Sequence, residues 1–497
     1  MKQYILAIDQ GTTSTKACIY DREQYLIAWA QQEFNQYFPQ VGRVEHAPEE
    51  LWQSVLTVCH KVLAIANVSA SQIAALGISN QRETTILWHK HTGEAVYPAI
   101  VWQDRRTFDD CQRLKEQGLD ALIHQKTGLL IDPYFSATKI RWILDHVPRA
   151  KDLADQGLLA FGTVESYLLW RLTGGKQHIT DVTNASRTLL MNIHTLTWDP
   201  ELLAIFAIPA SLLPTIVQNV GDFGETLPAL FGDAISIKAL IGDQQAAMIG
   251  QACITPGTLK ATLGTGAFLM LNSGSHVIQS TCHLISTVAY QVGGCVAYAL
   301  EGSVFNTGTA VKWLRDQLGL IKTADETESL ARSLSSNDGF YLVPSFTGFG
   351  APYWQPEISA MCCGITRSTS KAHFARGALE AVAYQLLDIK IAMERDVAFT
   401  IHELRVDGGL AVNHWFLQFL ADMLAIPLLM TSVTEASCSG AALLAAIGAG
   451  FYQDLTAATH HWHASRKILP TMASATRVAN HQGWIKAVTM LLNSVKE

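Results

Sequence analysis

Three short apolar runs in the first half of the chain have the length and pattern of buried strands. Residues 4–9, with the sequence YILAID, form an apolar run that ends at Asp9. A similar run, AALGISN, covers residues 74–80, and SIKALIG at 236–242 alternates polar and apolar positions. Runs of this length, bounded by turn-forming residues, are typical of strands. After the first run, a QGTTS turn and the segment TKACIYD predict a strand that returns to make a hairpin.

The second half of the chain opens with the same pattern. Residues 258–272, TLKATLGTGAFLMLN, predict a strand, a Gly-Thr-Gly turn and a second strand, and LRVDGG at 404–409 predicts a later strand. Over 371–396 and 415–424 the apolar spacing changes to that of amphipathic helices. The apolar face of the second helix carries Phe416, Phe419, Leu420, Met423 and Leu424. Alternating strands and helices predict an α/β protein with a faint internal duplication of its two hairpins.

Length and composition place the chain among ordered globular proteins with more than one domain. It has 497 residues, more than one hydrophobic core usually holds. Hydrophobic residues make up 49%, and the net charge of −7 argues against a nucleic-acid or anionic-membrane surface. The nine cysteines include no CxxC pair, which is typical of reduced thiols in a cytosolic core. The apolar runs are too short for a signal peptide or a membrane span, so we expect a cytoplasmic protein without membrane insertion.

Two glycine turns have the composition of phosphate-binding loops. DQGTTSTK at 9–16 offers backbone N–H groups, hydroxyls and a lysine, and GTG at 264–266 offers a second such tip. Backbone approaches a phosphate closely only where side chains are small, and its N–H groups then act as anion donors. A third glycine pair, at 408–409, follows a predicted strand. The Walker sequence GxxxxGK[ST] is absent, and no GxGxxG follows the first strand, so neither a Walker-type nor a dinucleotide site is expected.

Polar residues of interest stand where two other predicted strands end. In LIGDQQAAMIG, Asp243 follows a strand and opens a helix, which is where α/β proteins place ligand groups, although an ordinary helix N-cap is the alternative. Gln244 and Gln245 add amides that can bind hydroxyls. In SNQRETTILW, Arg82 and Glu83 stand side by side. They could form a solvated turn or grip a small polyhydroxylated ligand, and the local sequence leaves both open.

Together these segments resemble the FGGY family of carbohydrate kinases over nearly the whole chain, from about residue 4 to residue 455. The resemblance rests on AIDQGTTSTKA, GISNQRETTILW, AIVWQDRR, GDQQAAMIGQ, FTGFGAPYW, GLLIDPYFSATKIRWILDH and TDVTNASRTLLMNIHTLTWD. It implies an α/β fold of two ribonuclease-H-like domains, of the actin and hexokinase type, that flank a deep cleft. The expected domains are residues 1–252, which would bind a polyol, and residues 253–497, which would bind the nucleotide.

The stretches NQRETT and DPYFS are similar to those of family members that act on glycerol. The resemblance therefore implies that ATP phosphorylates glycerol to glycerol 3-phosphate, with Mg²⁺ as cofactor. Asp243 would be the general base, and Asp9 and Asp243 would face Mg²⁺, mostly through water. The implied polyol-binding residues are Arg82, Glu83, Trp102, Tyr134, Asp243, Gln244 and Phe268. The implied nucleotide-binding residues are Thr12, Thr13, Ser14, Lys16, Thr265, Gly308, Lys312, Gly409 and Asn413.

Two alternatives stay open at this point. One is a kinase for another polyol or sugar, such as xylulose, and the other is a non-catalytic nucleotide-binding regulator with the same fold. The pair Arg82 and Glu83, together with Asp9 and Asp243, argues against the regulator, because a pure binding module needs no catalytic base. A homo-oligomer is also left open.

Overall fold

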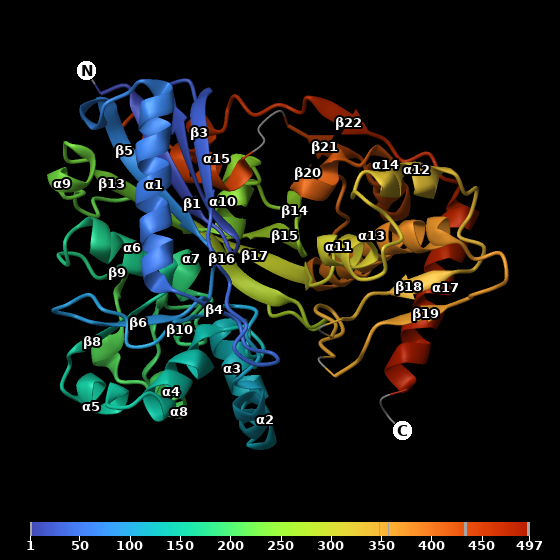
Figure 1. Cartoon of the computed structure of the whole chain (residues 1–497), viewed down its shortest axis with the longest axis horizontal. Coiled ribbons are helices and arrows are strands. Elements are labelled where there is room, and N and C mark those ends of the chain that lie inside the picture. The colour runs from blue at the N-terminus through green and yellow to red at the C-terminus, as the bar shows by residue number, and fades with distance from the viewer. Residues whose placement is uncertain (1, 347, 356, 432–434, 495–497) are drawn as a thin grey trace.

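Two β-sheets that lie side by side form the core of the protein (Figure 1). The structure, a computed structural model, describes residues 2–346, 348–355, 357–431 and 435–494. Thr347 of the FTGFGAPYW segment lies outside these ranges. None of the helices in the described ranges is long and apolar enough to cross a membrane. All nine cysteines are described, and no two of them form a disulfide.

The first sheet has five strands in the order β13-β5-β1-β2-β3. β1, β5 and β13 are parallel to one another, and β2 returns antiparallel to β1, so that Asp9 lies opposite Lys16. The predicted first hairpin and the two later strands are therefore confirmed. The strands are β1 (Tyr4–Gln10), β2 (Ser14–Tyr20), β3 (Leu26–Glu33), β5 (Ile73–Asn80) and β13 (Ile237–Gly242).

The second sheet has seven strands in the order β16-β17-β15-β14-β20-β21-β22. Five of them repeat the arrangement of the first sheet. β14 and β15 form an antiparallel hairpin, β17 pairs antiparallel with the outer side of β15, and β20 and β21 run parallel to β14. The strands are β14 (Leu259–Leu263), β15 (Ala267–Gly274), β16 (Ile285–Val292), β17 (Cys295–Val304), β20 (Leu404–Asp407), β21 (Leu428–Met430) and β22 (Arg466–Ile468). The duplication expected from the two hairpins thus extends to the whole order of strands.

Helices cover both faces of the first sheet. α1 (Pro48–Ala66) packs on β2 and β3, and it begins with a proline and two glutamates, which favour a helix N-terminus. On the opposite face, α15 (Ala436–Gly448) packs against β1, β5 and α10 (Asp243–Gly250). Glycine permits this close crossing, because a Cβ on Gly440 would lie 1.9 Å from the carbonyl oxygen of Ala246. A helix near the end of the chain is therefore anchored on the first sheet.

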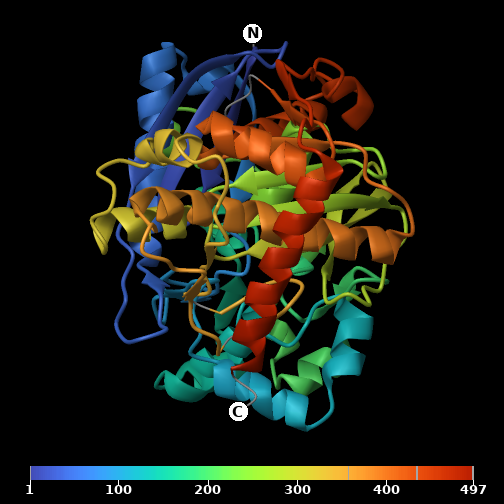
Figure 2. The same ribbon diagram turned by 90° about the vertical axis from the view of Figure 1, so that its right-hand side faces the viewer.

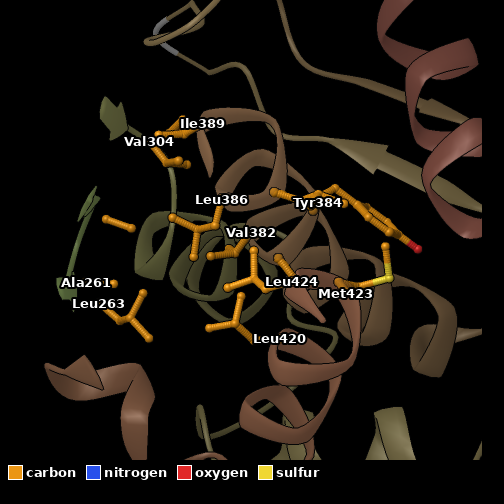
Figure 3. Close-up of a cluster of buried hydrophobic side chains, with 14 of the residues drawn as sticks. Ala261, Leu263, Val304, Val382, Tyr384, Leu386, Ile389, Leu420, Met423 and Leu424 are labelled. Atoms are coloured by element: carbon orange, nitrogen blue, oxygen red, sulfur yellow. The ribbon is translucent and has the colours of Figure 1, made fainter. Parts of the chain in front are cut away.

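The core of the second domain forms around one long helix. α13 (Lys371–Val397) crosses the second sheet, α14 (His414–Leu424) lies beside it, and α17 (Ser474–Asn493) runs across both (Figure 2). Figure 3 shows side chains of α13 and α14 that meet those of β14 and the end of β17. The five apolar positions predicted for α14 are all buried. Further elements here are α11 (Gly308–Asp316), α12 (Glu326–Arg332), β18 (Tyr341–Val343), β19 (Met361–Cys363) and α16 (Leu455–Ala458).

Most of a long insertion between β5 and β13 forms the lower part of the first domain, and its last helix, α9 (Pro228–Phe231), lies beside β13 (Figure 1). Its helices are α2 (Phe108–Glu116), α3 (Asp120–Thr127), α4 (Ser136–His146), α5 (Ala150–Asp155), α6 (Val164–Leu172), α7 (Val182–Ala185), α8 (Pro200–Ile205) and α9 (Pro228–Phe231). Its short strands are β6 (Ile86–His89), β7 (Ala99–Ile100), β8 (Leu159–Gly162), β9 (Ile179–Asp181), β10 (Met191–Asn192), β11 (Thr197–Trp198) and β12 (Thr215–Val217), and β7 pairs with β4 (Glu45–His46).

The chain passes from the first sheet to the second through residues 251–258, which form no helix or strand. The boundary expected between residues 252 and 253 falls in this connection and stays a prediction.

Candidate active site

A cavity of about 290 Å³ lies where the hairpin tips of both sheets meet the loop after β5. Its walls come from segments far apart in the sequence, which only the fold brings together. All seven residues implied to bind a polyol line it: Arg82, Glu83, Trp102, Tyr134, Asp243, Gln244 and Phe268. We call it the acceptor cavity.

Arg82 and Glu83 are buried, and each binds a different partner. Arg82 donates from both terminal nitrogens to the carboxylate of Glu301 on β17, at 2.6 and 3.0 Å. Glu83 accepts from Nε of Arg187 at 2.5 Å, and Arg187 also donates to Glu301 at 3.0 Å. Arg82 Nε and Glu83 Oε1 are 4.0 Å apart. With exposed fractions of 2% and 1%, Arg82 and Glu83 do not form a solvated turn.

Glu301 is the shared partner of the two arginines. Burial alone would raise its pKa, but the guanidinium groups of Arg187 and Arg82 outweigh burial and lower the pKa of Glu301 to about 2. Glu301 is therefore a carboxylate at neutral pH. It joins a strand of the second sheet to two residues of the first domain.

Glu83 has a backbone conformation that few residues other than glycine adopt. Its φ is 60°, in the left-handed region. A tight turn holds it there, because the Thr84 N–H donates to the Arg82 carbonyl at 2.7 Å. Ser136 also donates its hydroxyl to the Glu83 carbonyl at 2.9 Å. Such strain costs ~1–3 kcal/mol and occurs mostly at functional sites.

Asp243 opens α10 but does not cap it. The N-cap is Gly242, and the Asp243 carboxylate accepts from the Gln244 N–H at 2.6 Å and lies 3.3 Å from Arg82 Nε. Its side chain is 26% exposed. Burial raises the pKa of Asp243, although Arg82 and Lys260 oppose this. A raised pKa makes the carboxylate a stronger base, as general-base catalysis requires.

Gln244 is oriented by a buried lysine from the other sheet. Lys260 on β14 donates to Gln244 Oε1 at 2.6 Å and to the Thr262 hydroxyl at 2.8 Å. Because this bond occupies the amide oxygen, the amide nitrogen of Gln244 is left to donate to a ligand hydroxyl.

Three aromatic residues make the apolar wall of the acceptor cavity. The ring centroid of Trp102 lies 5.6 Å from that of Tyr134 and 6.1 Å from that of Phe268, in edge-to-face arrangements. The Trp102 indole N–H donates to the Thr12 hydroxyl at 2.9 Å, which ties this wall to the first hairpin tip. Apolar faces of this kind pack well against C–H groups.

A second cavity, of about 560 Å³, adjoins the first at the GTG tip, and we call it the nucleotide cavity. Five of the nine residues implied to bind the nucleotide line it: Thr265, Gly308, Lys312, Gly409 and Asn413. The Gly308 N–H donates to the Gly264 carbonyl at 3.1 Å, and a Cβ on Gly308 would lie 2.9 Å from that oxygen. Glycine therefore lets the start of α11 approach the tip. The volume is within the usual range of small-molecule sites.

The other four residues of the implied nucleotide set lie on the first hairpin. Thr12 and Thr13 line the acceptor cavity, as Thr265 and Lys312 also do. Ser14 and Lys16 line neither cavity. The Ser14 hydroxyl accepts from Gln31 at 2.9 Å, and Lys16 donates to Glu435 at 2.6 Å.

Asp9 stands at the end of β1, close enough to Asp243 for their charges to interact. Burial and the negative charge of Asp243 raise the pKa of Asp9 to about 7, against the hydrogen bond from Ser79 at 3.0 Å. In the described ranges no three His, Cys, Asp or Glu side chains gather as a metal cluster. Mg²⁺ is commonly held by one or two carboxylates together with phosphate and water, so Asp9 and Asp243 fit such an ion and it would relieve their repulsion.

A network of buried polar groups supports the end of β5, just before Arg82. Asn80 donates to Glu165 and to Asn184, both at 3.0 Å. In the part of the chain that the structure describes, neither Glu165 nor Asp181 forms an ion pair with a lysine or arginine. Burial and the charge of Asp181 raise the pKa of Glu165 to about 7.

This raised pKa predicts a pH-dependent stability. Because folded Glu165 holds its proton at higher pH than the unfolded chain does, the free energy of unfolding should fall as pH rises from about 4.5 towards 7. We expect Glu165→Gln to remove up to ~3 kcal/mol of this fall. Denaturant titrations of parent and variant at about pH 5 and about pH 8 measure it. Equal falls in both proteins would show that Glu165 does not titrate as stated.

Three charged residues of the site were not singled out by the sequence: Arg187, Glu301 and Lys260. Lys260 and Glu301 each interrupt an apolar strand pattern, in TLKATL and AYALEGSV, and a lone charge inside a predicted buried strand is a usable signal. Arg187 lies among small and apolar residues in NASRTLL. Their partners, however, are distant in the sequence, so the pairing itself has no local signal.

The fold and the cavities define a phosphotransferase of the two-domain, actin and hexokinase type. The chain belongs to the FGGY family of carbohydrate kinases, whose N-terminal domain matches residues 4–250 and whose C-terminal domain matches residues 259–449. The family and fold implied by the sequence are thereby confirmed.

The chain is similar over its full length to several glycerol kinases. The chain is 52% identical over 493 residues to the glycerol kinase of Coxiella burnetii, covering 99% of this chain and 98% of that protein. It is 52% identical over 497 residues to the glycerol kinase of Methylobacterium nodulans, covering 99% of both. The crystal structure of Plasmodium falciparum glycerol kinase with ADP is similar to this fold, with a TM-score of 0.90, 34% identity and 98% of both chains covered.

Proposed function

We infer that this protein transfers the γ-phosphoryl group of ATP to a terminal hydroxyl of glycerol, giving glycerol 3-phosphate. The observation that carries this is the position of Asp243: it lies in a small polar cavity that adjoins, at the GTG tip, a cavity of nucleotide size. The relatives that are about half identical over their full length are glycerol kinases, and the solved relative holds ADP.

The acceptor cavity offers partners suited to three neutral hydroxyls. Arg82 and the amide nitrogen of Gln244 donate, Glu83 accepts, and the Tyr134 hydroxyl can do either. Trp102 and Phe268 cover the carbon chain of the ligand.

We propose that Asp243 removes the proton from the attacking hydroxyl as the oxygen approaches the γ-phosphorus. In a loose phosphoryl-transfer transition state, most of the rate comes from positioning and charge stabilisation. The backbone N–H groups at the two hairpin tips would supply part of that stabilisation. The residues that line the cavities and are proposed to contact the nucleotide are Thr12, Thr13, Thr265, Gly308, Lys312, Gly409 and Asn413. Ser14 and Lys16, expected in the same role, would have to act from outside these cavities.

Asp9 and Asp243 are the residues proposed to hold Mg²⁺. The ion would neutralise charge on the phosphates of the nucleotide. The division into a polyol domain (1–252) and a nucleotide domain (253–497), and a cytoplasmic location, complete the proposal.

A panel of acceptors tests the assignment. With ATP and Mg²⁺, we expect kcat/KM for glycerol to exceed that for xylulose by roughly 10- to 100-fold, because a ligand that leaves one buried partner unpaired loses ~1–3 kcal/mol. The measurement is the initial rate of ADP release for each acceptor. A higher kcat/KM for xylulose would make the protein a sugar kinase. ATP binding without turnover on any acceptor would make it a regulator.

A further inference from the structure

The guanidinium of Arg82 lines the acceptor cavity, but its terminal nitrogens are already engaged. They donate to both oxygens of Glu301, at 2.6 and 3.0 Å, and to the Gln245 amide oxygen at 3.2 Å. A forked pair of N–H groups on Arg is the usual partner of a carboxylate or phosphate. In this protein Glu301, which is fully buried, takes the place that such a ligand would occupy.

The charges in the contact set around Arg82 and Glu301 also balance without an anionic ligand, and the lysine that lines the cavity, Lys312, is not part of this set. Arg82 and Arg187 contribute two positive charges, and Glu83 and Glu301 contribute two negative charges, within one set of contacts of 2.5 to 4.0 Å. Asp243, 3.3 Å from Arg82 Nε, adds a further negative charge. An acidic ligand would therefore meet a guanidinium that is already neutralised and a carboxylate that repels it.

We propose that Glu301 is a specificity-determining residue, which makes the acceptor cavity select a neutral triol over a carboxylate of the same size. Glycerate is the sharpest comparison, because it differs from glycerol only in having a carboxylate in place of one terminal CH₂OH group. Glu301 acts through Arg82 and does not itself line the cavity. The proposal rests on the proposed function, since it takes glycerol as the acceptor.

The contact geometry explains both why glycerol binds well and why a carboxylate of the same size binds poorly. Glu301 and Gln245 accept three of the five N–H groups of Arg82. The Nε N–H and one N–H of the second terminal nitrogen remain for the ligand, and they suit separate hydrogen bonds to hydroxyl oxygens. A desolvated carboxylate needs a compensating charge, and none remains uncompensated among these four residues. Specificity of this kind arises from the cost imposed on the wrong ligand as much as from contacts with the right one.

Glu301→Gln tests the proposal, because it removes the charge and keeps the shape and one acceptor oxygen. The dissociation constants of glycerol and of glycerate are measured by calorimetry for parent and variant, together with turnover on glycerol. In the parent, glycerate should bind far more weakly than glycerol. In Glu301→Gln, the dissociation constant of glycerate divided by that of glycerol should fall by at least about tenfold, which is a shift of the ratio towards glycerate. An unchanged ratio in a folded variant overturns the proposal.

Two controls separate charge from packing. Glu301→Asp keeps the charge with a shorter side chain, so it should weaken glycerol binding without moving the ratio towards glycerate. Glu380→Gln removes another buried carboxylate, which pairs with Arg376 at 2.6 Å on α13, and it should leave the ratio unchanged. A tenfold movement of the ratio in either control would overturn the proposal, because charge at Glu301 would then not be its cause.

If Glu301→Gln does not fold, Arg187→Gln tests the proposal instead, because it removes a positive charge from the contact set of Arg82, Arg187, Glu83 and Glu301. The ratio should then move away from glycerate, and movement towards glycerate overturns the proposal. A parent that does not phosphorylate glycerol contradicts the proposed function instead, so the two failures are distinguishable.

Discussion

Replacing Asp243 with asparagine is expected to lower kcat by roughly 10²–10⁴-fold, the usual contribution of a general base. The amide has nearly the same shape, but it cannot take the proton of the attacking hydroxyl. Because Gly242 rather than Asp243 is the N-cap of α10, the helix loses no capping side chain. We therefore expect little change in melting temperature or in ATP affinity, and all three quantities can be measured on one preparation.

A matched substitution shows what a true capping aspartate does. Asp454 caps α16, where its side chain accepts from the Ala457 N–H at 2.8 Å. Asp454→Asn should leave kcat unchanged, since asparagine caps helices as well as aspartate does. If kcat of Asp243→Asn stayed within about tenfold of the parent, or ~1.4 kcal/mol of barrier, Asp243 would not be the base.

Replacing Arg82 with alanine is expected to lower kcat/KM for glycerol by roughly 10- to 100-fold, since hydrogen bonds to charged groups contribute ~1.5–3 kcal/mol. The effect should appear mainly in KM for glycerol, with KM for ATP changed only a few-fold, because Arg82 lines the acceptor cavity and not the nucleotide cavity. The free energy of unfolding of the variant should also fall by ~3–5 kcal/mol, because buried Glu301 loses one of its two guanidinium partners. Arg187 is then the only one left to it in the described chain.

Arg106→Ala separates the two effects. Arg106 is also an arginine with a buried side chain, held by Glu45 at 2.7 Å and Asp104 at 2.8 Å, and it does not line the acceptor cavity. It should cost a similar unfolding free energy while KM for glycerol stays near that of the parent. A rise in KM confined to ATP in Arg82→Ala would refute the placement of Arg82 in the acceptor site.

Much of the scaffold could be predicted from local patterns. The buried runs at 4–9, 74–80 and 236–242 became β1, β5 and β13, because short apolar runs bounded by turn-forming residues favour strands buried inside a sheet. The glycine and threonine tips became hairpin turns, and the apolar spacing at 415–424 became the buried face of α14. The residues implied by the family resemblance at Arg82, Trp102, Tyr134, Asp243 and Phe268 do line one cavity.

Local patterns could not decide which way a polar side chain on a strand points, or which residue caps a helix. Ser14 and Lys16 belong to a motif of small and basic residues, yet β2 directs them to Gln31 and Glu435 and not to either cavity. By sequence, Asp243 was an acceptable N-cap for the helix that it opens. Only the backbone angles of Gly242, with φ of −66° and ψ of 149°, assign the cap to the glycine.

The partners of the buried charges were decided by the tertiary structure alone. By sequence, the nearest opposite charge to Arg82 is Glu83, but the fold gives Arg82 to Glu301, 219 residues away, and gives Glu83 to Arg187. The sequence by itself determined the strands, the turns and the chemical groups available, because these depend on neighbours along the chain. Which groups are joined, and hence the charge balance that a substrate meets, depends on contacts between segments far apart in the sequence, both within the first domain and between the two sheets, and these form only in the folded protein.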